Sequence, residues 1–129
     1  MAYPSLLITE LAVIGLADPG VPNQERILFR PMESVNLAGL GVAVGIPGPD
    51  GGAYALYDNV FWFPNDVVAP PSWVVLFTGR GSNTQTTLPT REKAHLYYWQ
   101  RLQTMFGAPN LVPILFRSGL IVIAPRIPG

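Results

Sequence analysis

Short apolar runs separated by clusters of Gly and Pro recur along the sequence. The chain holds 13 Gly and 14 Pro, and their positions between the runs are typical of short strands joined by tight turns. The clearest alternation lies in residues 25–30, where Ile27 and Phe29 share one face and the residues beside them share the other. Further strands are predicted over residues 5–14, 39–46, 54–63, 73–78, 111–116 and 120–123, the last two pairing across the turn 117–119.

About seven to nine short strands with regular turn signals predict one all-β sandwich domain over residues 1–129. The only helical candidate is the segment 91–106. Its central aromatic residues suit a strand equally well, so we expect an extended piece through Trp99 and then one short helix near 100–106. The segment 79–90 is rich in Ser, Thr, Asn and Gln, and we expect it to be a long polar loop.

The charge balance is the least usual global feature. Eight Lys and Arg residues offset eight Asp and Glu residues, and charged residues make up 12% of the chain, about half the usual share. A neutral chain has no long-range attraction for nucleic acid, which is therefore not expected as a partner. A sparsely charged surface also resists self-association poorly. We expect part of this surface to be covered by other protein subunits or by further copies of the chain.

No segment is expected to cross a membrane or to direct secretion. The longest apolar stretches, residues 6–17 and 119–124, are shorter than the ~20 residues that a membrane helix needs. The first stretch follows no Lys or Arg and contains Glu10, so it makes a poor signal peptide. The expected location is the cytoplasm or a macromolecular assembly.

The titratable residues give little support for catalysis. His95 is the only histidine, cysteines are absent and the acids are scattered singly, so no catalytic triad, thiolate site or metal cluster can be argued. The Gly-rich stretch 78–83 lacks the Lys-Ser or Lys-Thr ending of a phosphate-binding loop. We expect no catalytic residues, no metal and no cofactor. Two acids brought together by folding, as in glycosidases, keep a small hydrolase as a distant alternative.

Aromatic residues in strands and apolar termini supply candidate interface residues. Neighbouring residues of a strand point to opposite faces, so Trp62 points away from the phenylalanines on either side of it. By the same alternation, Tyr97 and Trp99 share a face. One face of each sheet is outward in a two-layer sandwich, and outward aromatics are common interface anchors. The candidate interface residues are Trp62, Tyr97, Trp99, Tyr3 and Ile127.

The polar segment 79–90 and the residues just after it offer a second candidate surface. Its Gly residues are most simply explained as turn residues. Its cations and amides could instead contact a partner. The candidate contact residues are Arg80, Asn83, Gln85, Arg91 and Lys93.

The order of these motifs resembles the lamin tail domain family. The resemblance rests on residues 8–10, 25–27, 35–40, 61–64, 73–77, 78–81 and 111–123, which follow one another as the family's motifs do. The sequence departs from the family at Arg30-Pro31, where an asparagine is usual, and at Leu40, where a large aromatic is usual. The resemblance implies an immunoglobulin-like β-sandwich and a binding module rather than an enzyme.

Two functional hypotheses follow besides the distant hydrolase. The first is a non-catalytic structural or interaction subunit that packs into or stabilises a larger protein assembly through apolar strands and terminal arms. The alternative is an autonomous recognition module that binds a peptide, a carbohydrate or a nucleic acid through residues 79–90.

Overall fold

A computed structural model describes residues 8–50, 52–119 and 124–128 of the chain. The described residues form ten β-strands and no helix. The strands are β1 (Leu11–Ala17), β2 (Arg26–Pro31), β3 (Val35–Asn36), β4 (Leu40–Pro47), β5 (Ala53–Trp62), β6 (Val67–Val68), β7 (Ser72–Phe77), β8 (Thr84–Thr87), β9 (Lys93–Tyr98) and β10 (Val112–Arg117). The prediction of an all-β sandwich is therefore confirmed.

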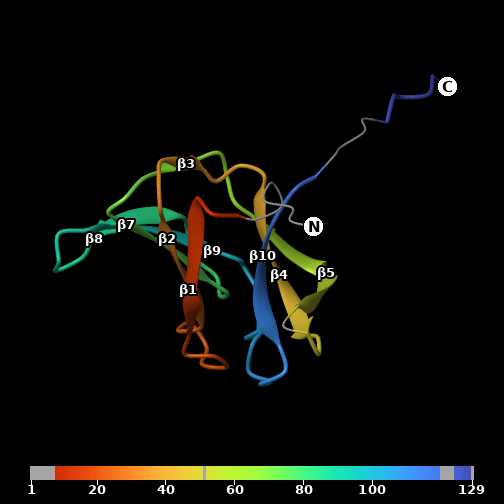
Figure 1. Ribbon diagram of the computed structural model, residues 1–129, viewed down its shortest axis with the longest axis horizontal. Coiled ribbons are helices and arrows are strands. Elements are labelled where there is room, and N and C mark those ends of the chain that lie inside the picture. Colours follow the sequence, from red (N-terminus) through yellow and green to blue (C-terminus); the bar gives the residue numbers. More distant parts are fainter. Residues whose placement is uncertain (1–7, 51, 120–123, 129) are drawn as a thin grey trace.

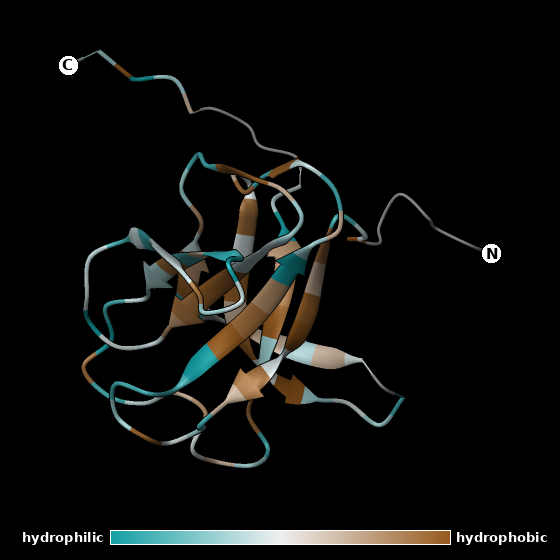
Figure 2. Ribbon diagram, turned by 90° about the vertical axis from the view of Figure 1, so that its left-hand side faces the viewer, coloured by the Kyte–Doolittle hydropathy of each residue, from teal (hydrophilic) through white to brown (hydrophobic). Residues whose placement is uncertain are grey.

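Two sheets face each other and form the layers of the sandwich (Figure 1). The larger sheet has the strand order β1-β2-β7-β9-β8 and is antiparallel except for the parallel pair β7 and β9. The smaller sheet has the order β10-β4-β5 and is antiparallel throughout. The short strands β3 and β6 pair separately at one end. Hydrophobic residues concentrate in the strands, while the connections are mostly hydrophilic (Figure 2).

The core lies between the two sheets and follows the alternation read from the sequence. β2 buries Ile27, Phe29 and Pro31, and leaves Arg26, Leu28 and Arg30 partly exposed, so the predicted alternation over residues 25–30 is confirmed within the strand. Aromatic rings join the two layers, because Phe63 makes edge-to-face contacts with Phe29 at 5.7 Å and with Tyr97 at 5.4 Å between ring centroids. An ion pair between Arg117 and Glu10 connects the end of β10 to the chain just before β1.

Three local predictions need correction. No helix forms near 100–106, where the chain makes bends whose backbone N–H groups are bound by residues far away in the sequence. The segment 79–90 is not wholly a loop, because residues 84–87 form β8 by pairing with β9. Among the described residues of the predicted strand 5–14, residues 8–10 are not in a strand, and β1 runs from Leu11 to Ala17; residues 5–7 lie outside the described residues. The predicted partner of 111–116, residues 120–123, lies outside the described residues, and β10 pairs with β4.

Candidate functional site

The outward side of the smaller sheet is built on a row of small residues in β4. Leu40, Val42 and Val44 point into the core and are buried, so the alternate positions 41, 43 and 45 point outward. These positions hold Gly41, Ala43 and Gly45. Small side chains along the central strand leave room for the larger side chains of the strands on either side.

Side chains from β5 and β10 fill that room. A Cβ atom placed on Gly41 would lie 2.9 Å from the ring of Phe116 and 3.1 Å from the ring of Trp62. These two rings meet edge to face above Gly41, with their centroids 5.1 Å apart. The side chain of Ile114 covers Gly45 in the same way. The side chains of β5 and β10 therefore cover the small residues of β4 on the outward side of the sheet.

The resulting surface is apolar throughout its described part. Directly opposed residues of paired strands share a face, so the register identifies the outward residues of β5 and β10. We call the outward residues Gly41, Ala43, Gly45, Ala55, Val60, Trp62, Val112, Ile114 and Phe116 the outer face. An antiparallel sheet with one solvated face normally carries polar residues on that face. None of these nine residues is polar. Gly41, Ala43 and Gly45 are themselves buried beneath the flanking side chains, so the flanking residues form the surface, and Trp62 is 51% exposed.

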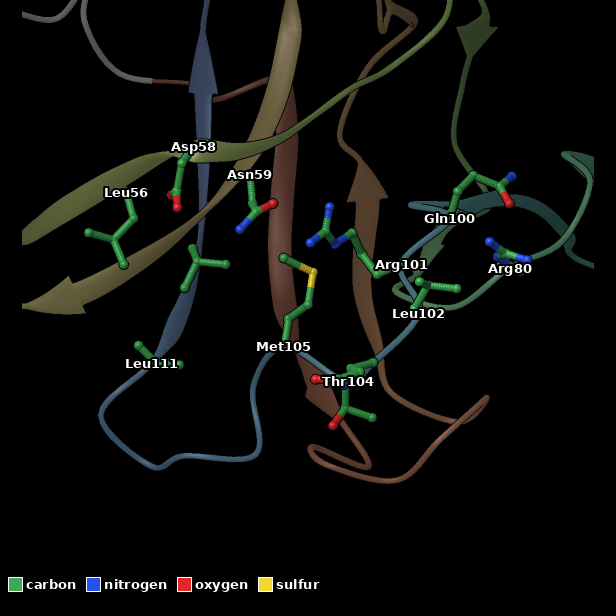
Figure 3. A pocket seen from close by; sticks show the side chains of 12 residues that line it. Leu56, Asp58, Asn59, Arg80, Gln100, Arg101, Leu102, Thr104, Met105 and Leu111 are labelled. Atoms are coloured by element: carbon green, nitrogen blue, oxygen red, sulfur yellow. The ribbon is translucent and has the colours of Figure 1, made fainter.

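A hollow of about 620 Å³ opens at one end of the sandwich (Figure 3). Its floor is apolar and comes from Val44, Leu56, Met105 and Leu111. Polar and charged side chains from β5 and from the segment 100–104 surround this floor. We call this cavity the end hollow.

A bulge in β5 places polar groups over the end hollow. The pairing of β4 with β5 jumps from Ala43 opposite Val60 to Val44 opposite Leu56, so residues 57–59 have no opposite partner in β4. Bulges of this kind redirect side chains and are common beside functional sites. Asp58 and Asn59 line the end hollow from the bulge.

The segment 100–106 forms the opposite wall, and hydrogen bonds fix both of its ends. At its start, the Arg101 N–H donates to the Thr78 carbonyl at 2.9 Å. At its end, the N–H groups of Met105 and Phe106 donate to the Glu25 carboxylate at 2.7 and 3.0 Å. The wall is thus held by groups that lie far from it in the sequence, and the same bonds hold Met105 in the floor.

Glu25 is a buried carboxylate with a full set of donors. Besides the two groups on the wall, it accepts hydrogen bonds from the Gly20 N–H at 2.7 Å and from the Thr78 hydroxyl at 2.8 Å. Burial raises the pKa of Glu25, but the hydrogen bonds from Met105, Gly20, Thr78 and Phe106 outweigh it and hold the pKa below its usual value. Glu25 therefore remains charged in the folded protein near neutral pH.

A smaller polar recess lies beside β8 and is lined partly by Asp66, Gln85 and His95. The Tyr97 hydroxyl donates to the Asp66 carboxylate at 3.0 Å. Burial lowers the pKa of His95, which Asp66 only partly offsets, so its imidazole is neutral near neutral pH. Within the described residues, no three potential metal ligands come together. The recess therefore offers hydrogen-bonding groups.

The candidate interface residues have different fates. Tyr97 and Trp99 are 2% and 7% exposed and pack within the core, so neither is available to a partner, contrary to the prediction. Trp62 is exposed on the outer face, and Ile127 is 91% exposed. Tyr3 lies outside the described residues.

The candidate contact residues of the polar segment do not form one surface. Arg80 lines the end hollow, whereas Asn83 and Gln85 line the recess beside β8. Arg91 and Lys93 are exposed at the far end of β8 and line neither cavity. Neither the bulge in β5 nor the bonds to Glu25 could be predicted from the sequence, because both depend on pairing between distant segments.

Comparison of the chain with protein-family models, with curated proteins and with solved structures finds no match in any of the three. The lamin-tail resemblance and the immunoglobulin-like class therefore stay predictions. A search of the described residues finds no helix that is both long and apolar enough to cross a membrane.

Proposed function

We propose that this protein is a non-catalytic structural subunit that assembles through its outer face, with a second copy of the chain as its partner. The observation that carries the proposal is the composition of that face, where all nine outward residues given by the register are Gly or apolar. Apolar area left in water costs roughly 25 cal/mol per Å². Packing a second layer against the outer face would remove this cost.

The absence of charge from the outer face favours self-association. A two-fold axis brings the same patch of two subunits together, so any charged group near the axis would face its own copy. The outer face has no such group among its assigned residues. The sparse charge of the whole chain, 12% of residues, also lowers the repulsion between copies. Ile127, which is exposed near the C-terminus, is a second candidate contact.

The test is the molar mass by light scattering over a concentration series. We expect the wild-type chain to have twice the single-chain mass, and Trp62→Glu to have the single-chain mass because it replaces the most exposed ring of the outer face by a charge. Met32→Glu is the matched control, since Met32 is 62% exposed but lies outside the outer face. Circular dichroism would check that each variant is folded.

A second variant of the outer face tests the same contact in case Trp62→Glu fails to fold. Val112→Lys places a charge at the start of β10, where the face ends. A single-chain mass for the wild type at high concentration would rule out self-association and point to a different protein as the partner. An unchanged oligomer in both folded variants would exclude the outer face.

A further inference from the structure

We infer that the end hollow binds an apolar carboxylate, either a free acid or the carboxyl end of a peptide chain. This site is separate from the outer face, because none of the residues that line it belongs to that face. The inference rests on the volume of the hollow, on the separation of its aliphatic side chains from its arginines, and on two guanidinium groups that have no partner among the described residues.

The size and floor of the hollow suit a small ligand or a single side chain. Its volume of about 620 Å³ lies within the range of roughly 300–1,000 Å³ found for small-molecule sites. Leu56, Leu111 and Val44 line it with branched aliphatic groups, and Met105 adds an adaptable thioether chain. The hydrophobic effect would favour transfer of an aliphatic chain from water onto this floor.

The cationic groups lie away from the aliphatic side chains. Figure 3 shows Leu56 and Leu111 at one side of the hollow and Arg80 and Gln100 at the other, with Arg101 between them. Within the described part of the chain, neither guanidinium has a hydrogen bond or an ion pair. A guanidinium presents paired N–H donors that match the two oxygens of a carboxylate. The arginine end is therefore the place for the charged group of the ligand.

Gln100 fixes the two arginines relative to each other. Its N–H donates to the Gly79 carbonyl at 3.0 Å. Its side chain both donates to the Gly81 carbonyl at 2.5 Å and accepts from the Gly81 N–H at 3.3 Å. The residues on either side of Arg80 are thus bound to the residue that precedes Arg101. The site is pre-organised, so ligand binding need not order these backbones.

Asp58 sets the orientation of the ligand. Its carboxylate lines the hollow on the side of Leu56 and has no hydrogen-bond or ion-pair partner among the described residues. It would repel a second carboxylate, which reinforces the placement of the ligand's charge at the arginine end. It would accept a hydrogen bond from an amide N–H, which a peptide end carries and a free acid lacks.

The first experiment follows the methionine methyl groups by NMR while the intact protein is titrated with butanoate, hexanoate and octanoate. We expect the Met105 methyl signal to shift and the Met32 signal to stay, since only Met105 lines the hollow. Affinity should rise roughly fourfold for each added CH₂ group. Hexanamide is the uncharged control. No shift of Met105, or equal affinity for hexanoate and hexanamide, would overturn the inference.

The second experiment uses variants and separates the two sources of the carboxylate. Arg101→Gln keeps the backbone bond to Thr78 and should weaken hexanoate binding roughly tenfold or more, while Arg126→Gln, outside the hollow, should bind as the wild type does. Tighter binding of N-acetyl-leucine than of 4-methylpentanoate would identify a peptide end, and the reverse a free acid. Equal affinity of wild type and Arg101→Gln would refute the site.

Discussion

The Glu25 carboxylate accepts a hydrogen bond at 2.7 Å from the backbone N–H of Met105, a residue 80 positions later in the chain. Together with the bond from Phe106, it closes the segment 100–106 against the start of β2. This is the element for which the sequence predicted a helix. A helix would have bound its own N–H groups within the segment, whereas here a buried charge binds them. One carboxylate therefore links the stability of the sandwich to the shape of the end hollow.

Glu25→Gln should lower the free energy of unfolding by about 2–4 kcal/mol, because hydrogen bonds to a buried charge are strong and an amide N–H₂ would face backbone donors. Glu33→Gln is the matched control, since Glu33 is exposed. Denaturant unfolding of both variants measures the difference. Equal stability of the two would show that the Glu25 bonds contribute no net stability.

Stability should fall in acid because of the same group. The pKa of Glu25 is lowered in the folded protein from a usual value of 4.5, so the unfolded chain binds more protons near that pH. The contribution of Glu25 is therefore fully present above this usual value and is lost as the pH falls through the folded pKa. Unfolding free energies measured from about pH 6 to pH 3 should decline less steeply in Glu25→Gln than in the wild type.

Glu92 must be separated from this effect. The hydrogen bond from Arg30 lowers the pKa of Glu92 as well, so Glu92 adds its own acid dependence. Glu25→Gln retains Glu92, so the difference between wild type and variant isolates Glu25. Parallel curves for the two proteins would contradict the assignment.

Gly41→Ala tests how the outer face is built. The added Cβ would lie 2.9 Å from the Phe116 ring, 3.1 Å from the Trp62 ring and 3.1 Å from the Phe61 carbonyl oxygen. Because the carbonyl belongs to the backbone, the strands must shift, and we expect a loss of roughly 1–3 kcal/mol in unfolding free energy. Gly15→Ala in β1 is the control, because a Cβ there has nothing within 4 Å. A neutral Gly41→Ala would mean that the face adapts freely.

Local alternation predicted the strands that bury one face. In β2 and β4, large apolar residues at every second position identified the strand and the side that faces the other sheet, because that period depends only on nearby residues. Strand β8 escaped prediction since all four of its residues are polar and exposed. It exists because its backbone pairs with the edge of β9, and the side chains of such an edge strand carry no apolar signal.

Alternation shows which residues share a face of a strand, but it does not show which face is buried. For this reason Trp62 is exposed as predicted, whereas Tyr97 and Trp99 are buried. The sequence showed that Tyr97 and Trp99 share a face, but not that this face is the inner one. The inner face is set by the partner sheet, where Phe61 and Phe63 meet the rings of Trp99 and Tyr97. Trp62 is then outward because its neighbours are inward. The end hollow could not be predicted from the sequence, because it depends on the register shift between β4 and β5 and on contacts between residues that are distant in the chain.

Tyr97→Phe should lower the free energy of unfolding by roughly 1–2 kcal/mol, because it removes a hydrogen bond to a charged partner and leaves the ring in place. The Tyr97 hydroxyl donates to Asp66 at 3.0 Å, and burial, reinforced by that carboxylate, holds the pKa of Tyr97 far above its usual value. Tyr98→Phe is the control, since the Tyr98 ring stacks on Phe77 at 5.2 Å and its hydroxyl has no partner within the described residues. The midpoint temperature of thermal unfolding should be clearly lower for Tyr97→Phe than for Tyr98→Phe. If the two variants unfold together, the bond to Asp66 does not hold the loop before β6 to the core, and Tyr97 contributes only as an aromatic ring packed against Phe63.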